Sequence, residues 1–364
     1  MKTIVEGVNT MGELIKGVQE KAQPEVQTQA EPSPSSKVQP AYRQQLKQLD
    51  INDFLQKSDF QAFRLLAFNW SLIVLAFVIP AIWLNPLNIC ISLLVLANRQ
   101  LGLSILMHEC AHYSLFKTRP LNNWLGQVFF AAPILANVSG YRSYHLKHHR
   151  EAGTTDDPDY PNYKDYPVSK MSLLRKTARD FSGLTGIKMI YAMLLMNAGI
   201  LSYDLSYQGR KNDQQLSKLS IVKNLLKNLC LPFTIQLAMF SVLYVSGHAW
   251  LYSLWWISYL TVYMFLLRIR NAAEHANVPD LLDKDPRLHA RTTYAIWWER
   301  MTFAPNFVNF HLEHHWQANV PCYHLKAFHY YIKSKGLLAD VEVSTGYFDV
   351  VKRMLGNVNS VPVN

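Results

Sequence analysis

Three short histidine clusters are the residues of this sequence best suited to metal chemistry. They read His108-Glu-Cys-Ala-His112, His145-Leu-Lys-His148-His149 and His311-Leu-Glu-His314-His315, and together they hold eight of the 13 histidines. On a helix, side chains three or four residues apart lie on one face, so each cluster would project its imidazoles in one direction. Convergent imidazoles are metal ligands, and we expect these clusters to bind two ions.

Chance accounts for the first cluster but not for the other two. A chain of this length with this many histidines should contain roughly 0.5 HxxxH matches by composition, but only about 0.02 HxxHH matches. The two HxxHH clusters therefore carry the prediction of a metal site.

The composition indicates a membrane protein. The 364 residues are 49% hydrophobic, and the net charge of +10 comes from basic residues outside the apolar segments, which is typical of cytoplasmic membrane loops and argues against a nucleic-acid partner. The four cysteines contain no CxxC pair, so neither a zinc thiolate site nor a disulfide framework is indicated. We expect ordinary buried thiols at Cys90, Cys110, Cys230 and Cys322.

Four segments are apolar enough to cross a membrane. They are Leu65–Leu84, Leu87–Met107, Cys230–Ser246 and Leu251–Leu267. The turns that join the first to the second and the third to the fourth contain no Lys or Arg, so two hairpins with both termini cytoplasmic are predicted. The predicted fold is an all-α integral membrane protein, with a helical cytosolic cap from residues 108–229 and 268–364 that holds a di-metal site.

The N-terminal region precedes this membrane domain of residues 46–364. Residues 1–45 are rich in Pro, Gln, Ser and Glu and lack a signal-peptide pattern, so they are predicted to be a disordered cytosolic tail. A helical pattern begins at Ala41 and should lie on the membrane surface, and Ser58-Asp-Phe-Gln61 has the form of a capping box for the first span.

Two shorter apolar stretches and one charge bear on this topology. Trp124–Val138 contains Pro133 and Ile187–Leu201 contains Lys188, so both are predicted to be helices in the interface or partly inserted. All three clusters then face the cytoplasm, as a shared site requires. Arg99 is the one formal charge inside a predicted span, where helix packing is the simpler role and headgroup binding the alternative.

A fourth element, Asn271-Ala-Ala-Glu-His275, follows the last span. With it, the order HxxxH, HxxHH, NxxxH and HxxHH resembles the membrane fatty acid desaturase family, over most of the chain after the tail. That resemblance implies two irons held by nine histidines, with an asparagine acting through a water. Carried over to this sequence, the implied ligands are His108, His112, His145, His148, His149, His275, His311, His314, His315 and Asn271.

The resemblance also implies a reaction and its partners. We expect O2-dependent removal of two hydrogens from adjacent methylenes of a fatty acyl or lipid substrate, in a bacterial inner membrane. The chain has no His-Pro-Gly-Gly haem motif, so electrons should come from a separate ferredoxin, rubredoxin or cytochrome. Trp255, Trp256 and Tyr259 could line the acyl tunnel, although an interfacial aromatic belt is the simpler role.

Several alternatives stay open. A related di-iron hydroxylase or a carotenoid ketolase uses similar clusters. The first cluster also matches HExxH, the signature of a zinc protease with Glu109 as base, and histidine clusters could serve a metal transporter.

Other residues near the clusters are given expected roles. We expect the ligands to be oriented by nearby carboxylates, for which the candidates are Glu109, Asp156, Asp157, Asp159, Glu274 and Glu313. We interpret four of the remaining histidines as ordinary surface or core residues: His248, His289, His324 and His329.

Overall fold

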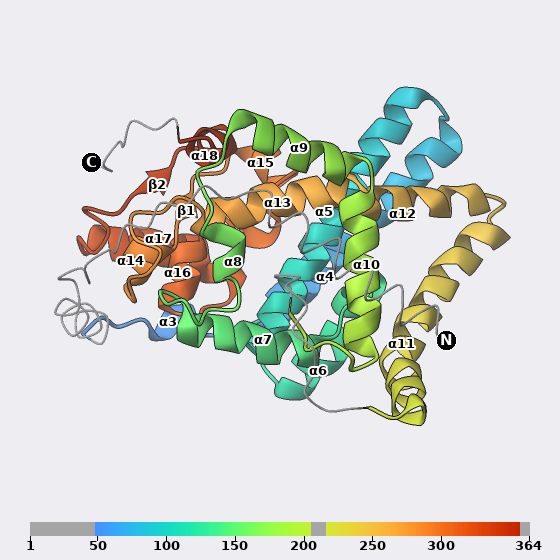
Figure 1. Ribbon diagram of the computed structural model, residues 1–364, viewed down its shortest axis with the longest axis horizontal. Helices are drawn as coiled ribbons and strands as arrows, with labels where there is room; N and C mark the ends of the chain where they lie inside the picture. Colours follow the sequence, from blue (N-terminus) through green and yellow to red (C-terminus); the bar gives the residue numbers. More distant parts are fainter. Residues whose placement is uncertain (1–47, 205–215, 357–364) are drawn as a thin grey trace. The chain divides into compact units, whose positions relative to one another are not determined.

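The structure is a computed structural model that describes residues 48–204 and 216–356, and this part of the chain is mostly helical (Figure 1). In chain order its elements are α3 (Asn52–Leu55), α4 (Asp59–Ile82), α5 (Pro86–Ala111), α6 (Arg119–Leu125), η2 (Gly126–Ala131), η3 (Ala132–Ile134), α7 (Val138–Glu151), α8 (Tyr160–Tyr163), α9 (Lys170–Phe181), α10 (Leu184–Asn197), α11 (Lys218–Val245), η4 (Ala249–Leu251), α12 (Tyr252–Leu260), α13 (Val262–His275), α14 (Pro286–His289), β1 (Thr292–Thr293), α15 (Trp297–Arg300), η5 (Pro305–Phe307), α16 (His311–Trp316), α17 (Cys322–Ser334), β2 (Val343–Ser344) and α18 (Tyr347–Met354). Besides its helices, the described chain has two strands of two residues each, β1 and β2, which pair in parallel. The predicted tail, residues 1–45, lies outside the described residues.

Four helical segments of the described chain are long and apolar enough to cross a membrane: α4, α5, α11 and the run Ala249–His275. Their most apolar windows differ in burial, from 61% in α5 to 17% in α11. The helix α5 packs against α4, α7, α12 and α13, so it is the central helix, and it carries the first histidine cluster at its end.

A buried polar network joins α4 to α5. The guanidinium of Arg99 donates to the side-chain oxygens of Asn98 and Asn69, and Asn69 in turn donates to Asn306. Asn306 donates to the backbone oxygen of Gly102 at 2.8 Å, where a Cβ would collide with Asn69. Arg99 is 1% exposed, so it serves helix packing and does not reach a lipid headgroup.

The stretch Trp124–Val138 is not the continuous helix that the sequence predicts. After α6 the backbone turns through the π-helical η2 and the 3-10 η3 to Leu135, which has a φ of 60°. The backbone oxygens freed here are paired by side chains of the candidate spans: Gln236 donates to Pro133 at 2.6 Å, and Tyr259 donates to Ile134 at 2.8 Å. Irregular backbone among apolar helices requires such partners.

The fourth predicted span is also interrupted. Thr261, with φ −118° and ψ −83°, separates α12 from α13, and α13 continues past the predicted end at Leu267 to His275. Gly186 of α10 lies against the backbone of Leu260 beside this break, because no Cβ keeps the two helices apart. The helix α10 covers Leu184–Asn197, 14 residues, and is too short to be a candidate span.

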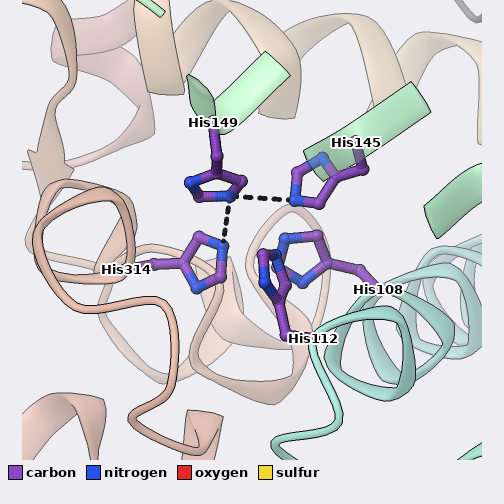
Figure 2. A group of neighbouring side chains, drawn as sticks. All are labelled: His108, His112, His145, His149 and His314. Carbon is purple, nitrogen blue, oxygen red and sulfur yellow. Dashed lines mark hydrogen bonds between the residues drawn. The ribbon is translucent and has the colours of Figure 1, made fainter. Parts of the chain in front are cut away.

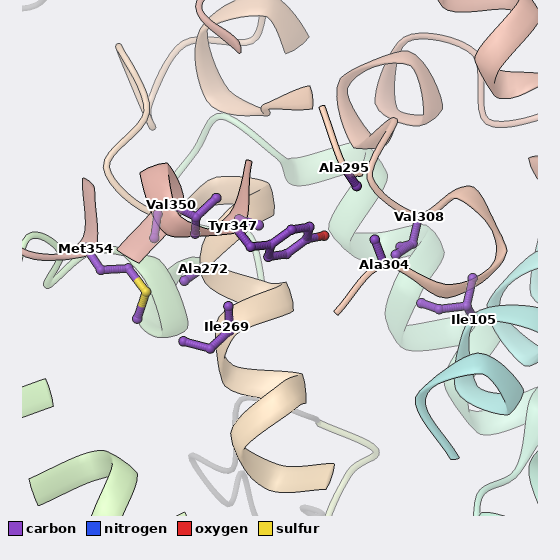
Figure 3. Close-up of a cluster of buried hydrophobic side chains, with 11 residues drawn as sticks. Ile105, Ile269, Ala272, Ala295, Ala304, Val308, Tyr347, Val350 and Met354 are labelled. Atoms are coloured by element: carbon purple, nitrogen blue, oxygen red, sulfur yellow. The ribbon is translucent and has the colours of Figure 1, made fainter. Parts of the chain in front are cut away.

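A cluster of buried apolar side chains holds α13 in place (Figure 3). Ile269, Ala272 and Ala273 of α13 pack with Tyr347 and Val350 of α18, and the cluster extends to α5 and to residues 295–308. Small alanines let the backbones approach closely. The face of α13 that carries His275 is thereby fixed by packing on another face of the same helix.

Two local predictions are corrected. Cys110 and Cys322 are buried as expected, but Cys90 and Cys230 are exposed, because they lie on the outer faces of α5 and α11.

Ser58 caps α4 by accepting from the backbone N–H of Gln61 at 3.4 Å, but its own N–H donates to the hydroxyl of Tyr323, so the reciprocal half of the capping box is absent. Of the predicted lead-in, only Asn52–Leu55 is helical among residues 48–58.

The apolar cluster predicts which core residue the helix α13 depends on. Ile269 is 2% exposed, so Ile269→Ala should lower the free energy of unfolding by about 2–4 kcal/mol through lost contacts and a residual cavity. The matched control is Ile257→Ala in α12, because Ile257 is 45% exposed. Thermal unfolding in one detergent measures both, and equal shifts would contradict the role of the cluster.

Candidate metal centre

The histidine clusters lie at helix ends. His108 and His112 close α5, His148 and His149 lie in the last turn of α7, and His275 is the last residue of α13. The carboxyl end of a helix carries partial negative charge. Three such ends therefore meet at a point where positive charge is stabilised.

The structure brings the nine predicted histidines together in two neighbouring groups. The first histidine group contains His108, His112, His145, His149 and His314, and Figure 2 shows their rings turned toward a common centre. The second histidine group contains His148, His275, His311 and His315. Within each group the candidate ligand atoms lie within 4.8 Å of one another.

Helix geometry explains how each HxxHH cluster divides between the groups. Around a helix, the last histidine of such a cluster lies about 40° from the first, because they are four residues apart. The middle histidine lies about 60° from the first in the opposite direction. His145 and His149 accordingly share the first group while His148 enters the second. In the last cluster His311 and His315 share the second group, and His314 enters the first.

The nitrogens that face each other are spaced like ligands of one ion. The Nε2 atoms of His149 and His145 are 3.0 Å apart, as are those of His149 and His314 (Figure 2). In the second group, Nε2 of His311 lies 2.9 Å from that of His275. Ligands about 2.1 Å from an ion and at right angles to each other are about 3.0 Å apart.

Protein acceptors fix which nitrogen carries the proton. Nδ1 of His275 lies 2.7 Å from the backbone oxygen of His289, and Nδ1 of His148 lies 2.8 Å from a carboxylate oxygen of Asp157. Both partners accept only, so Nδ1 donates and Nε2 keeps a bare lone pair. Nε2 of His148 nevertheless faces Nε2 of His315 at 3.2 Å. Nε2 of His275 also faces Nε2 of His311, whose Nδ1 lies beside Glu274, and a cation between these two lone pairs would remove their repulsion, so the donor set fits metal ions.

Buried polar atoms without partners support the same fit. Within the described chain, Nε2 of His108, Nε2 of His112 and Nδ1 of His314 are buried and make no hydrogen bond. A buried polar atom left unpaired is costly. A bound ion would satisfy all three.

Burial opposes the charged form of the site's imidazoles that lie outside the spans. It lowers the pKa of His112 to about 3, and with the neighbouring histidines it holds the pKa of His145 and His314 well below the usual range. Burial also opposes the charged form of His148, but Asp157 outweighs it and raises the pKa of that imidazole. Neutral imidazole is the form that binds metal.

Four of the six candidate carboxylates contact a histidine of the two groups. Besides Asp157, an oxygen of Asp159 lies 3.6 Å from Nδ1 of His148, Glu109 lies 3.2 Å from Nδ1 of His108, and Glu274 lies 3.3 Å from Nδ1 of His311. Asp156 is exposed, and in the described chain its side chain makes no hydrogen bond to a histidine. Acceptors of this kind hold the ring orientation of metal ligands.

Glu313 has a different role from the predicted one. Its carboxylate accepts from Nδ1 of His329 at 2.6 Å and from the hydroxyl of Thr292. Nε2 of His329 lies 2.9 Å from the hydroxyl of Tyr294. These contacts tie α16, which carries the third cluster, to α17 and β1, so His329 is a supporting residue of the site.

Arg142 connects the first two clusters. It lies on α7, and its guanidinium donates to the backbone oxygens of Ala111 at 2.9 Å and Cys110 at 3.0 Å. These oxygens belong to the open end of α5, whose last turn carries His108 and His112. A single side chain therefore satisfies one helix end and fixes it beside the helix that carries the second cluster.

Glu109 is not placed as a protease base. One carboxylate oxygen accepts from the hydroxyl of Ser114 and the backbone N–H of Cys322, both at 2.9 Å, and the other lies beside His108. His108 and His112 also share their group with three further histidines. The HExxH match is therefore part of a larger donor set.

A cavity of about 120 Å³ lies beside the two histidine groups, with room for several water-sized groups. It is lined by five of the nine histidines and by apolar side chains that include Met189 and Met193 of α10. Tyr259 also lines it and Trp255 is fully buried, so neither belongs to an interfacial belt. Asn271 lines it as well, with its amide oxygen accepting from Arg270 at 3.0 Å.

His289 is the residue near the site that sequence reasoning missed. It is 3% exposed, its ring centroid lies 5.4 Å from that of His315, and its Nε2 makes no hydrogen bond within the described residues. The other three histidines outside the clusters do not join either group; His248, for example, bonds the backbone of Ser246. No spacing signal marks His289, because it lies in a separate short helix.

Comparison with known proteins shows the family of this chain. The sequence profile described as "Fatty acid desaturase" matches residues 81–345. Dihydrorhizobitoxine desaturase of Bradyrhizobium elkanii is 26% identical over 251 residues, 66% of this chain and 65% of that protein. Two proteins named sn-1 acyl-lipid omega-3 desaturase (ferredoxin) also match. The one from Synechocystis is 36% identical over 69 residues, which are 19% of this chain and 18% of that protein. The one from Nostoc is 34% identical over 75 residues, which are 19% of this chain and 21% of that protein.

The chain thus spans less than two thirds of the length of each of these relatives. The profile match, in contrast, covers most of this sequence, from the first candidate hairpin to β2. The chain belongs to the fatty acid desaturase family.

Proposed function

We propose that this protein is an O2-dependent desaturase that introduces a double bond into a fatty acyl chain with a di-iron centre. The observation that carries the proposal is the convergence of nine imidazoles on two points beside a cavity with apolar walls. The names of the relatives support desaturation, and two of them specify an acyl-lipid substrate. Asn271, one helical turn before His275 and lining the same cavity, would complete the ligand set through a water.

The proposed topology places these residues in one compartment. The four candidate spans would cross the membrane as two hairpins, with both termini and the cap of residues 108–229 and 268–364 on the cytoplasmic side of a bacterial inner membrane. The support is that the three clusters follow or lie between the candidate spans and still meet in one site.

The reaction divides between the metal pair and the chain. When bound, the iron pair supplies the activation of O2 and the removal of the two hydrogens. Two adjacent methylenes, O2, two electrons and two protons then give a cis double bond and two waters. The side chains fix the imidazoles through Asp157 and Glu274, hold the acyl chain against the site, and exclude bulk water.

The alternatives differ in what the same site would do. A hydroxylase or carotenoid ketolase would use the same two groups, so only its product distinguishes it. A zinc protease would leave the second histidine group without a role, and a transporter would need ligands along the spans, whereas both groups lie at helix ends.

Metal analysis tests the site. Purified protein should contain about two irons per chain, the stoichiometry that the two groups imply. His149→Ala should cause marked loss, because His149 faces both His145 and His314. His324→Ala, outside both groups and partly exposed, should keep the full content. Equal iron in the two variants would reject the site.

A matched pair of neighbouring aspartates tests the orienting carboxylates. Asp157→Asn should weaken metal binding by about 10–100-fold, because the neutral amide replaces the charged carboxylate that accepts the hydrogen bond from Nδ1 of His148. Asp156→Asn changes an exposed side chain and should leave binding unchanged. Competition with a chelator measures both, and the prediction is wrong if the two variants behave alike.

Lipid analysis tests the reaction. The protein would be expressed in a host of known lipid composition, beside His149→Ala as the inactive control, and fatty acids profiled by mass spectrometry. New double bonds that require the intact site would support desaturation. Products that gain oxygen instead would reassign the chain to a hydroxylase or ketolase.

A further inference from the structure

A second cavity, of about 150 Å³, adjoins the cavity beside the histidine groups. Asn162 of α8 and Leu267 and Asn271 of α13 line both cavities. Leu267 and Asn271 are four residues apart and share one face of α13, whereas Arg268 and Ala272 lie on the next face and line only the second cavity. The two cavities therefore meet along the stripe that Leu267 and Asn271 form on this helix.

The second cavity has mixed walls, and we call it the polar cavity. Five of its eight lining residues are polar: Asn162, Tyr166, Thr185, Arg268 and Asn271. Arg268 is the one charged residue among the eight. A few polar groups in a small cavity orient a ligand, so this cavity suits the polar end of a molecule whose apolar part lies beside the histidines.

A buried carboxylate balances the charge of Arg268. Asp180 of α9 is 0% exposed and accepts from Nε of Arg268 at 2.5 Å and from Nη2 at 2.7 Å. The hydroxyl of Thr185 donates to the same carboxylate at 2.7 Å. The pair fixes the guanidinium at the cavity wall. Its further N–H groups, and the hydroxyl of Tyr166 that also interacts with it, are donors for an acceptor oxygen.

This pair discriminates between a carbonyl and a carboxylate. A carboxylate beside Arg268 would meet a cation whose charge is already balanced, and Asp180 would repel it. The carbonyl oxygen of an ester accepts a hydrogen bond without adding a charge, so it escapes that repulsion. Lys176 lies over the ring of Tyr166, with Nζ 4.9 Å from the ring centre, but it is not among the residues that line the cavity.

We propose that the polar cavity binds the neutral carbonyl end of an acyl ester, and that Asp180 and Arg268 select this ester over a free fatty acid. The inference rests on the proposed function and names the substrate class of the same site. With the carbonyl at Arg268, the hydrocarbon chain passes Leu267 into the cavity beside the histidines. His275 follows Arg268 by seven residues on α13, about 10 Å along the helix, so methylenes several bonds from the carbonyl lie at the histidines.

Photolabelling of the full-length protein in detergent tests the placement. One probe is methyl stearate with a diazirine on its third carbon, and irradiation should attach it to the segment from Met264 to Ala272. A second probe carries the diazirine next to the terminal methyl group and should label Met189 or Met193 of α10, which line only the first cavity. The reverse pattern would overturn the proposal.

Competition against the first probe tests the selection. At about pH 9, where stearate is ionised, methyl stearate should displace the probe at a concentration about tenfold lower than stearate does. Asp180→Asn should remove most of this preference, because the unbalanced charge of Arg268 then attracts the carboxylate. Asp165→Asn, which removes an exposed carboxylate next to Tyr166, is the matched control and should keep the preference.

Three results of the competition would contradict the selection. They are equal displacement by stearate and methyl stearate in the wild type, an unchanged preference in a folded Asp180→Asn variant, and an equal loss of preference in Asp165→Asn. The two wild-type measurements decide the proposal even if Asp180→Asn does not fold. Stearoyl-lysophosphatidylglycerol and stearoyl-coenzyme A serve as further competitors, and the one that displaces the probe more strongly shows whether the ester is lipid-linked or a thioester.

The binding experiments need neither iron nor O2. Label in the wrong cavity would therefore overturn this inference and leave the proposed function standing. A product with added oxygen would overturn the proposed function without changing the position of the label.

Discussion

The repulsion between imidazole lone pairs is the constraint on which the rest of the structure depends. Nε2 of His275 and Nε2 of His311 face each other at 2.9 Å, while the protein holds the Nδ1 of His275 as a donor to a backbone oxygen. Nδ1 of His311 lies 3.3 Å from Glu274, so with both Nδ1 atoms beside acceptors a bound cation would remove the repulsion between the two Nε2 lone pairs. Burial is unfavourable for nine imidazoles without partners. Positive ions at the two points would pair with these imidazoles, and the nearby carboxylates and helix ends would stabilise the positive charge.

Most of the surrounding fold serves to hold these nitrogens in register. The helix α5 is central and buried, Arg142 fixes its end beside α7, and Glu313 with His329 fixes α16. The apolar cluster around Ile269 sets the rotation of α13. Each cluster is thus positioned by contacts made elsewhere on its own helix, which explains how four separate stretches of chain reach one site.

The cavity lies on one side of the two histidine groups. It is lined by Met193, Tyr259 and five of the histidines, whereas His149 and His315 do not line it and are half-buried. A molecule held in a cavity with such apolar walls is kept from bulk water.

The sequence by itself determined which histidines gather in the two groups and that four apolar segments exist, because histidine spacing and hydrophobic length are local properties of the chain. Even the division of each HxxHH cluster between two groups follows from helix rotation alone. Only the tertiary structure decided that Thr261 interrupts the last candidate span, that Glu313 supports α16 through His329, and that His289 approaches the site. These depend on contacts between residues distant in sequence, whose packing and hydrogen bonding leave no periodic signal in the chain.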